Sequence, residues 1–318
     1  MQGRYSFWIR VLYCLVVGLA VSSYFIPLGD KVGEWLPLLG GFADFSAFNE
    51  NLLLRGVLGG IFNVLIALSL LAINTKSVHN VFLPNFTVAF FLVIALLNPS
   101  AVYFSTIHPA VLLMVWGQYC FISSQKFTSM FLLSCAALFY APLLLALPFV
   151  LIISVLGAAD ILRVTLKSLG GLILPFVYLL SFRYMAYADA MVFIDEYVQK
   201  AIDFSSPLYR VSFTSLFLVL CIGSVLMHSL SNVFRKLFRN SIITEHILKM
   251  ELMCMLLGGA MFFMFWGNGD VPVNIIVALP LSMLFSFHFT GNITAAPARI
   301  EFILLCCAAV ISRLYYFI

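Results

Sequence analysis

The sequence predicts an all-α, polytopic integral membrane protein of about 11 transmembrane helices, and three observations support that prediction. Of 318 residues, 63% are apolar and only 9% are charged, against roughly 45–50% and 25% in soluble domains. The mean hydropathy is +1.09. Apolar runs near the length of a bilayer span recur along the chain, without the alternating pattern of a barrel strand. This composition excludes a soluble enzyme and a secreted disulfide scaffold.

Charge and cysteine usage exclude further classes. The net charge of +4 is modest and the 17 basic residues are dispersed between apolar runs, so no nucleic-acid partner is expected. All seven cysteines lie in apolar runs and none forms a CxxC pair, which favours buried thiols over disulfides or a metal site. The sequence contains no phosphate-binding loop and no HExxH motif, and we expect no metal and no cofactor.

Eleven hydrophobic segments are the expected membrane helices, because backbone polar groups in lipid need partners within their own segment. They span 6–27, 52–73, 81–97, 104–122, 127–140, 142–157, 168–183, 208–231, 248–266, 272–289 and 300–317. The first carries Arg4 and Arg10 like a signal peptide, but its apolar run is longer than usual, which favours a retained helix. No long polar linker interrupts the chain, so residues 1–318 are expected to form a single helical transmembrane domain.

The segment 127–157 is predicted to be a short helical hairpin. As one helix, its 31 residues would be about 46 Å long, beyond a hydrocarbon core of roughly 30 Å, and Pro142 stands near its centre. With a hairpin and a cytoplasmic N-terminus, 11 basic residues lie inside and 6 outside, whereas a single span gives 8 and 9. The positive-inside rule therefore favours the hairpin.

Acidic residues segregate in the same topology, with nine outside and four inside. This points to the outer side for acid–base chemistry; the alternative is that these acids simply solvate the outer loops. Two outer segments hold most of them. The first, about 29–51, is too apolar for a free loop and should lie on the membrane surface or within the bundle. The second, about 184–207, repeats apolar residues at helical spacing, which predicts an interfacial amphipathic helix.

Four outer residues are the main site candidates. Asp44 and Glu50 are candidate catalytic residues, because an interfacial carboxylate close to aromatic side chains suits a general base. Arg55 and Arg183 are expected at the outer boundary of the hydrocarbon core. A guanidinium there suits a lipid phosphate, which it binds bidentately. The alternative for both arginines is snorkelling to headgroups or pairing with a loop acid.

Three further residues, His108, Asp195 and Glu196, are candidate accessory groups on the same side. His108 is suited to shuttle a proton, with a hydrogen-bonded structural histidine as the alternative. Two other histidines, His228 and His288, are expected at the inner interface of the membrane.

Two stretches carry a resemblance to known membrane proteins. One covers 98–156 and begins Asn-Pro; the other covers 273–292 and contains an Ala-Leu-Pro-Leu-Ser run. Both resemble an uncharacterised family of multi-pass inner-membrane proteins of Bacteroidota. The first is also distantly similar to C-type glycosyltransferases, which use polyprenyl-phosphate-linked sugars. That similarity implies a catalytic acid in the first outer loop, where this chain has Asp44 and Glu50 but no adjacent acidic pair.

These observations lead to the expectation of a multi-pass protein of the bacterial inner (cytoplasmic) membrane. The first hypothesis is an envelope glycosyltransferase-like enzyme that uses a polyprenyl-phosphate-linked sugar at the outer leaflet. The alternatives are a lipid or envelope-precursor transporter, and a non-catalytic subunit or assembly factor of an envelope or secretion complex. Membrane lipids are expected partners in each case, with a polyprenyl-phosphate-linked substrate in the first and a protein partner in the last.

Overall fold

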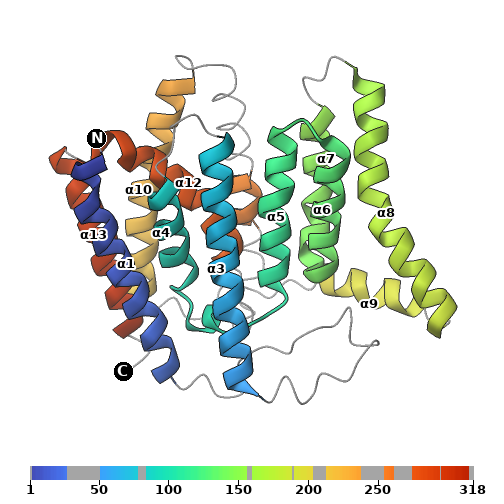
Figure 1. Cartoon of the computed structure of the whole chain (residues 1–318), viewed down its shortest axis with the longest axis horizontal. Coiled ribbons are helices and arrows are strands. Elements are labelled where there is room, and N and C mark those ends of the chain that lie inside the picture. Colours follow the sequence, from blue (N-terminus) through green and yellow to red (C-terminus); the bar gives the residue numbers. More distant parts are fainter. Residues whose placement is uncertain are drawn as a thin grey trace. The chain divides into compact units, whose positions relative to one another are not determined.

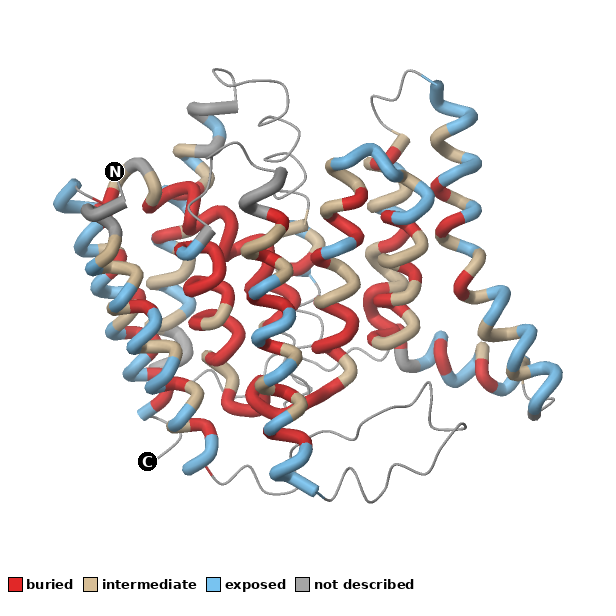
Figure 2. Tube along the Cα trace, viewed as in Figure 1, coloured by how far each residue is buried: buried red, intermediate tan, exposed pale blue. Residues whose placement is uncertain are grey.

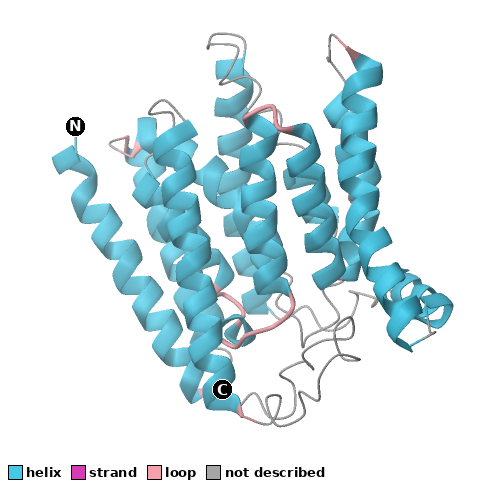
Figure 3. Cartoon of the chain, turned by 45° about the vertical axis from the view of Figure 1, so that its right-hand side comes forward, coloured by secondary structure: helices cyan, strands magenta, loops and turns pink. Residues whose placement is uncertain are grey.

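The computed structural model describes residues 2–26, 51–77, 84–155, 160–187, 190–202, 213–237, 254–260, 274–293 and 295–314. Within these ranges the chain is helical apart from short turns and bends, and no strand occurs in them, as Figure 3 shows. The all-α class is therefore confirmed for this part of the chain.

The helices follow the predicted hydrophobic segments, and most are labelled in Figure 1. They are α1 (Gln2–Phe25), α3 (Leu52–Ser77), α4 (Pro84–Ala95), η2 (Pro99–Val102), α5 (Ile107–Ile122), α6 (Lys126–Phe139), η3 (Ala141–Leu145), α7 (Leu147–Val155), α8 (Ile161–Tyr187), α9 (Ala190–Ile202), α10 (Phe213–Leu237), α12 (Asn274–Asn292) and α13 (Ala296–Leu314). Residues 254–260 are also helical. Each of the predicted segments thus contains helix.

Among the described residues, three stretches are long and apolar enough to cross a membrane: Ser6–Phe25, Leu52–Ile73 and Ile161–Ala186. Other apolar helices in the described ranges are shorter. With 12 residues, α4 extends only about 18 Å, against a hydrocarbon core of roughly 30 Å. Eleven full spans and their orientation therefore stay predictions.

Contacts between residues divide the chain into two compact units. Unit 1 comprises Met1–Gly33, Gly56–Phe104 and Ser205–Ile318, and unit 2 comprises Glu34–Arg55 and Ser105–Phe204. Unit 1 therefore holds α1, most of α3, α4, α10, α12 and α13, while unit 2 holds α5 to α9. The single transmembrane domain expected over the whole chain stays a prediction.

Unit 1 has an aromatic core between α4 and α12. The ring of Phe90 lies 5.8 Å from that of Phe285 and 5.3 Å from that of Phe289, between centroids. Phe302 of α13 lies 5.6 Å from Phe289. Figure 2 shows α12 buried along almost its whole length, as expected of a helix that is apolar all round. Helices α4, α12 and α13 therefore share one aromatic core.

The chain leaves α4 through a buried turn, and side chains from other helices bind its carbonyl groups. Asn274, at the start of α12, donates to the carbonyls of Ile94 and Ala95 at 2.8 and 2.7 Å. Arg313, near the end of α13, donates to the carbonyl of Leu96. The last carbonyls of a helix have no partner within it, and leaving one unsatisfied in lipid costs several kcal/mol. These two side chains therefore allow α4 to end inside unit 1.

Helix α3 approaches this turn closely at Gly59. A Cβ atom added to Gly59 would meet the carbonyl of Val102 and would stand 2.7 Å from the backbone nitrogen of Phe104. The pair Gly56 and Gly60 has the small-xxx-small spacing that predicts close packing. A Cβ on Gly56 would lie 3.2 Å from the ring of Tyr24, whereas one on Gly60 has nothing within 4 Å. One half of the pair is therefore in close contact, and the closest approach to backbone lies at Gly59.

We expect Gly59→Ala to lower the free energy of unfolding by about 1–3 kcal/mol. The added methyl group would clash with backbone atoms of Val102 and Phe104, and a backbone cannot move aside as easily as a flexible side chain can. Gly60→Ala is the matched control on the same helix. It should be neutral or stabilising by up to about 1 kcal/mol, since alanine is the better helix former. Thermal unfolding of the purified protein in detergent measures both, and equal losses would contradict the close approach.

Unit 2 packs α6 against both α5 and α8. Ser129 Oγ donates to the carbonyl of Gly117 at 2.8 Å and so joins α6 to α5. On the other side, Gly171 of α8 lies against the carbonyl of Phe127, where a Cβ would not fit. After α6 the chain turns through η3, which contains Pro142, into α7. The break predicted within 127–157 is therefore confirmed.

Helix α9 is the amphipathic helix predicted in the second outer segment. One face, formed by Phe193, Tyr197 and Ala201, is buried together with η3 and α8. Asp195 and Glu196 lie on the exposed side. The spacing of three and four residues that predicted amphipathicity therefore corresponds to a buried face and an exposed face.

The hydroxyl of Tyr197 fastens α9 to α6 by donating to the carbonyl of Ala137 at 2.8 Å. Burial raises the pKa of Tyr197, so the hydroxyl keeps the proton that it donates. We expect Tyr197→Phe to cost about 1 kcal/mol, the net worth of one hydrogen bond, and to speed amide hydrogen exchange in 190–202. Tyr178→Phe, at a side chain 67% exposed on α8, is the control. Unchanged exchange in α9 would argue against this anchor.

Candidate functional site

Of the four predicted catalytic and phosphate-binding residues, the two arginines lie within the described part of the chain. Asp44 and Glu50 lie outside the described residues, so their catalytic role stays a prediction. Arg55, in the first turn of α3, is only 2% exposed. The guanidinium of Arg183 lies over the ring of Phe193, 4.7 Å from its centroid, in a cation–π contact that joins α8 to α9. Phosphate binding by these two arginines stays a prediction.

The predicted accessory residues have separate environments. His108 is fully buried, and its Nδ1 accepts the backbone N–H of Ser105 at 3.2 Å. This contact holds the first turn of α5, which is the structural alternative raised for this histidine. Asp195 and Glu196 lie on the exposed side of α9. The accessory catalytic role of all three stays a prediction.

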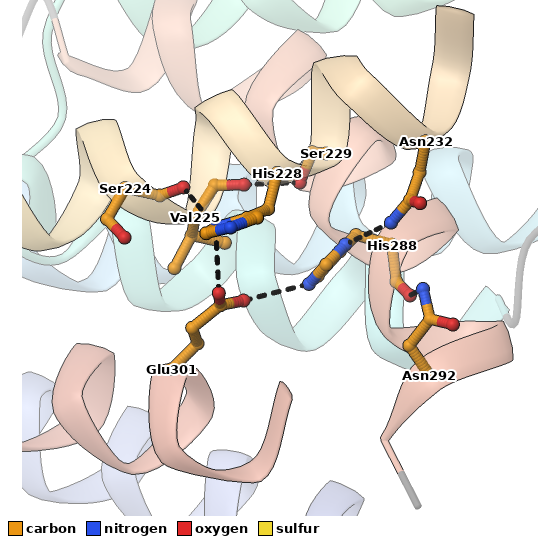
Figure 4. A network of polar contacts seen from close by, with 8 residues as sticks. All are labelled: Ser224, Val225, His228, Ser229, Asn232, His288, Asn292 and Glu301. Atoms are coloured by element: carbon orange, nitrogen blue, oxygen red, sulfur yellow. Dashed lines mark hydrogen bonds and ion pairs between the residues drawn. The ribbon is translucent and has the colours of Figure 1, made fainter. Parts of the chain in front are cut away.

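A different set of polar side chains meets in unit 1, where α10, α12 and α13 come together (Figure 4). Glu301 Oε1 lies 2.8 Å from His228 Nδ1, and Glu301 Oε2 lies 2.9 Å from His288 Nε2. Asn232 Nδ2 lies 2.7 Å from His288 Nδ1. One carboxylate thus bridges two histidines from different helices. We call His228, Asn232, His288 and Glu301 the His–Glu–His cluster.

The surrounding acceptors fix where the ring protons lie in this arrangement. His228 Nδ1 faces two acceptors, the Glu301 carboxylate and the carbonyl of Ser224 at 3.1 Å, so this nitrogen carries a proton. His288 Nε2 donates to Glu301, while His288 Nδ1 accepts from the Asn232 amide. A neutral imidazole carries one proton. Neutral His228 therefore has an unprotonated Nε2, and neutral His288 is the Nε2–H tautomer.

The cluster is open at one end and closed at the other. The side chain of His228 is 62% exposed, that of Glu301 is 13% exposed and that of His288 is 6% exposed. Both histidines nevertheless belong to apolar stretches, Phe217–Asn232 and Asn274–Thr290. Ionisable groups are costly inside apolar membrane helices, and there they typically mark functional sites.

This arrangement suits proton transfer. Both Glu301 oxygens already accept imidazole N–H groups. Within the described ranges, no group of three or more His, Cys, Asp or Glu side chains is placed to hold a metal ion. The unprotonated Nε2 of His228 can take a proton from outside, and the carboxylate beside Nδ1 can receive the proton that this nitrogen releases.

Sequence reasoning did not bring these residues together. The sequence places His228 and His288 at the inner interface of the membrane. It places Glu301 among the four acidic residues on the predicted inner side. A local signal was nevertheless present, because an asparagine follows each histidine by one helical turn, at Asn232 and Asn292. In the structure Asn232 binds the ring of His288, and Asn292 donates to its carbonyl at 3.1 Å.

Comparison with protein-family models, with curated protein sequences and with solved structures gives no match. The resemblance to the Bacteroidota membrane family and to C-type glycosyltransferases therefore stays a prediction.

Proposed function

We propose that this chain is a polytopic membrane protein of the proton-linked transport class, and that the His–Glu–His cluster takes up and releases the proton. The observation that carries the proposal is the carboxylate of Glu301 shared by two imidazoles within apolar helices. Histidine is the side chain that ordinarily changes charge near neutral pH. Chains of acidic residues and histidines inside membrane bundles typically serve as proton relays.

The proposal includes a place in the cell, the bacterial inner membrane with the N-terminus in the cytoplasm. The excess of basic residues on the predicted inner side supports it. In that topology the cluster lies near the cytoplasmic ends of its helices. Glu301, for example, stands about 8 Å along the axis from the start of α13 at Ala296. The proton would therefore be exchanged with the cytoplasm through His228.

Among the hypotheses drawn from the sequence, a lipid or envelope-precursor transporter is the one that makes use of this cluster. Lipid would be the neighbour of the exposed apolar side chains on the long helices, such as Leu162 and Tyr178 of α8. Glycosyl transfer at the outer leaflet stays a prediction, because Asp44 and Glu50 would have to perform it.

Proton uptake into proteoliposomes tests the proposal. The full chain is reconstituted, a membrane potential is imposed with potassium and valinomycin, and a trapped dye reports internal pH. We expect vesicles with the wild-type protein to acidify faster than vesicles without protein. His228→Phe should remove the excess, because phenylalanine keeps a ring at that place but cannot exchange a proton. Equal rates for the wild type and empty vesicles would overturn the proposed function.

A further inference from the structure

Asn232 lies directly beside the ring of His288. It follows His228 by one turn of α10, and its amide nitrogen lies 2.7 Å from Nδ1 of the His288 ring. A side-chain amide has a donor end and an acceptor end, and Figure 4 shows the donor end turned toward the ring. His288 itself is 5% exposed, so this amide is a defined neighbour in a site that water reaches poorly.

With the amide nitrogen turned toward it, Nδ1 of neutral His288 must be unprotonated. The ring proton then lies on Nε2, 2.9 Å from Glu301 Oε2. In this state His288 cannot accept a proton from Glu301, because the nitrogen that faces the carboxylate already carries one.

A half-turn of the amide reverses this relation. The amide oxygen would then face Nδ1 and accept a hydrogen bond from it, so neutral His288 would carry its proton on Nδ1. Nε2, facing Glu301, would become an acceptor. The two ends of an amide have nearly the same shape, so the half-turn needs no rearrangement of the helices.

In the second state a proton can pass from His228 through Glu301 to His288. A proton from water adds to His228 Nε2, and the proton on Nδ1 moves to Glu301 Oε1. His228 is then neutral again and Glu301 is a neutral acid. A half-turn of the carboxyl group about its bond to Cγ carries this proton to the side that faces His288. There the acid gives it to the unprotonated Nε2 of His288, which leaves a carboxylate and an imidazolium. The Nδ1 proton of that imidazolium is held by the oxygen of Asn232.

We propose that Asn232 is a positioning residue that sets the direction of proton transfer in the cluster. Its amide nitrogen holds His288 as a donor to Glu301, and its amide oxygen converts His288 into an acceptor from Glu301. The inference rests on the proposed function, because it assigns a direction to the proton that the cluster moves.

Nitrogen-15 NMR of the full chain in lipid nanodiscs tests this inference, with ring nitrogens labelled and the His288 signals assigned by their loss in His288→Gln. At alkaline pH we expect the wild type to show His288 protonated at Nε2 and unprotonated at Nδ1. Asn232→Asp replaces the amide with a group of the same shape that only accepts hydrogen bonds. It should therefore move a proton onto Nδ1.

Asn292→Asp is the matched control. It introduces the same charge beside the same residue, but Asn292 contacts the carbonyl of His288 rather than its ring. The control should keep the wild-type ring tautomer. An Nδ1 of His288 that stays unprotonated in Asn232→Asp, or that becomes protonated equally in Asn292→Asp, would overturn the role of Asn232. The tautomers are measured without any proton flux, so a failure of the proposed function in proteoliposomes is a separate result.

Discussion

Glu301→Gln is expected to leave the protein folded and to slow proton uptake into proteoliposomes by about 100-fold or more, the usual contribution of a group that transfers protons. Glutamine has the shape of glutamate, so the space between the two histidines stays filled. Its amide cannot take up a proton at neutral pH, and only its oxygen accepts an imidazole N–H. The path from His228 to His288 is therefore interrupted at the bridging group.

Measuring the stability of Glu301 variants distinguishes a loss of proton transfer from a loss of packing. Glu301→Gln leaves one imidazole N–H without its acceptor, at a cost of about 1–2 kcal/mol. Glu301→Leu removes the acceptor of the buried His288 N–H and should cost roughly 1–3 kcal/mol, while the exposed His228 keeps the carbonyl of Ser224 as an acceptor. Unfolding in detergent measures the cost, and the dye assay measures uptake. Wild-type uptake in a folded Glu301→Gln variant would contradict the proton path.

Arg313→Met is expected to give the largest loss of stability, about 2–4 kcal/mol in the free energy of unfolding. Arg313 is 4% exposed and donates to the carbonyls of Leu19 and Leu96 and to the hydroxyl of Ser23. Methionine fills a similar space but donates nothing. Hydrogen bonds within membrane bundles average about 0.6 kcal/mol and reach about 1.7, and three of them are lost here.

Arg299→Met is the matched control on the same helix. Arg299 is exposed, and surface substitutions usually change stability by less than about 0.5 kcal/mol. Arg313→Lys keeps the charge but cannot reproduce the geometry of a guanidinium, so its loss should fall between the two. If Arg313→Met and Arg299→Met had the same midpoint of thermal unfolding, the role of Arg313 at the end of α4 would be contradicted.

Local patterns predicted the helices of this protein because local rules govern them. Backbone groups in an apolar run find partners only within a helix, so hydropathy located the segments. The turn at Pro142 followed from helix length together with the distribution of charge. The face of α9 formed by Phe193, Tyr197 and Ala201 followed from spacing, since residues three and four apart lie on one side of a helix.

The sites depend on which helices pack together, and no local pattern contains that information. His228, His288 and Glu301 come from three helices, and each residue alone looked like an interfacial group. In the topology with the hairpin and a cytoplasmic N-terminus, Arg313 is one of the six basic residues predicted on the outer side. The structure instead buries it against the end of α4. The spacing of Gly56 and Gly60 predicted a contact face; Gly56 does contact Tyr24, but the η2 turn lies against Gly59 and nothing lies against Gly60.

The protonation of Glu301 is the most direct test of the proton path. Infrared difference spectra of the protein in lipid, recorded between alkaline and acidic pH, report a carboxylic acid band when a carboxylate takes up a proton. The other carboxyl groups of the chain contribute bands that the wild type and Glu301→Gln share. We expect the wild type to show one further band, sensitive to deuterium exchange, that is missing from Glu301→Gln. Identical acid bands in the wild type and in Glu301→Gln would contradict the claim that this carboxylate carries the proton.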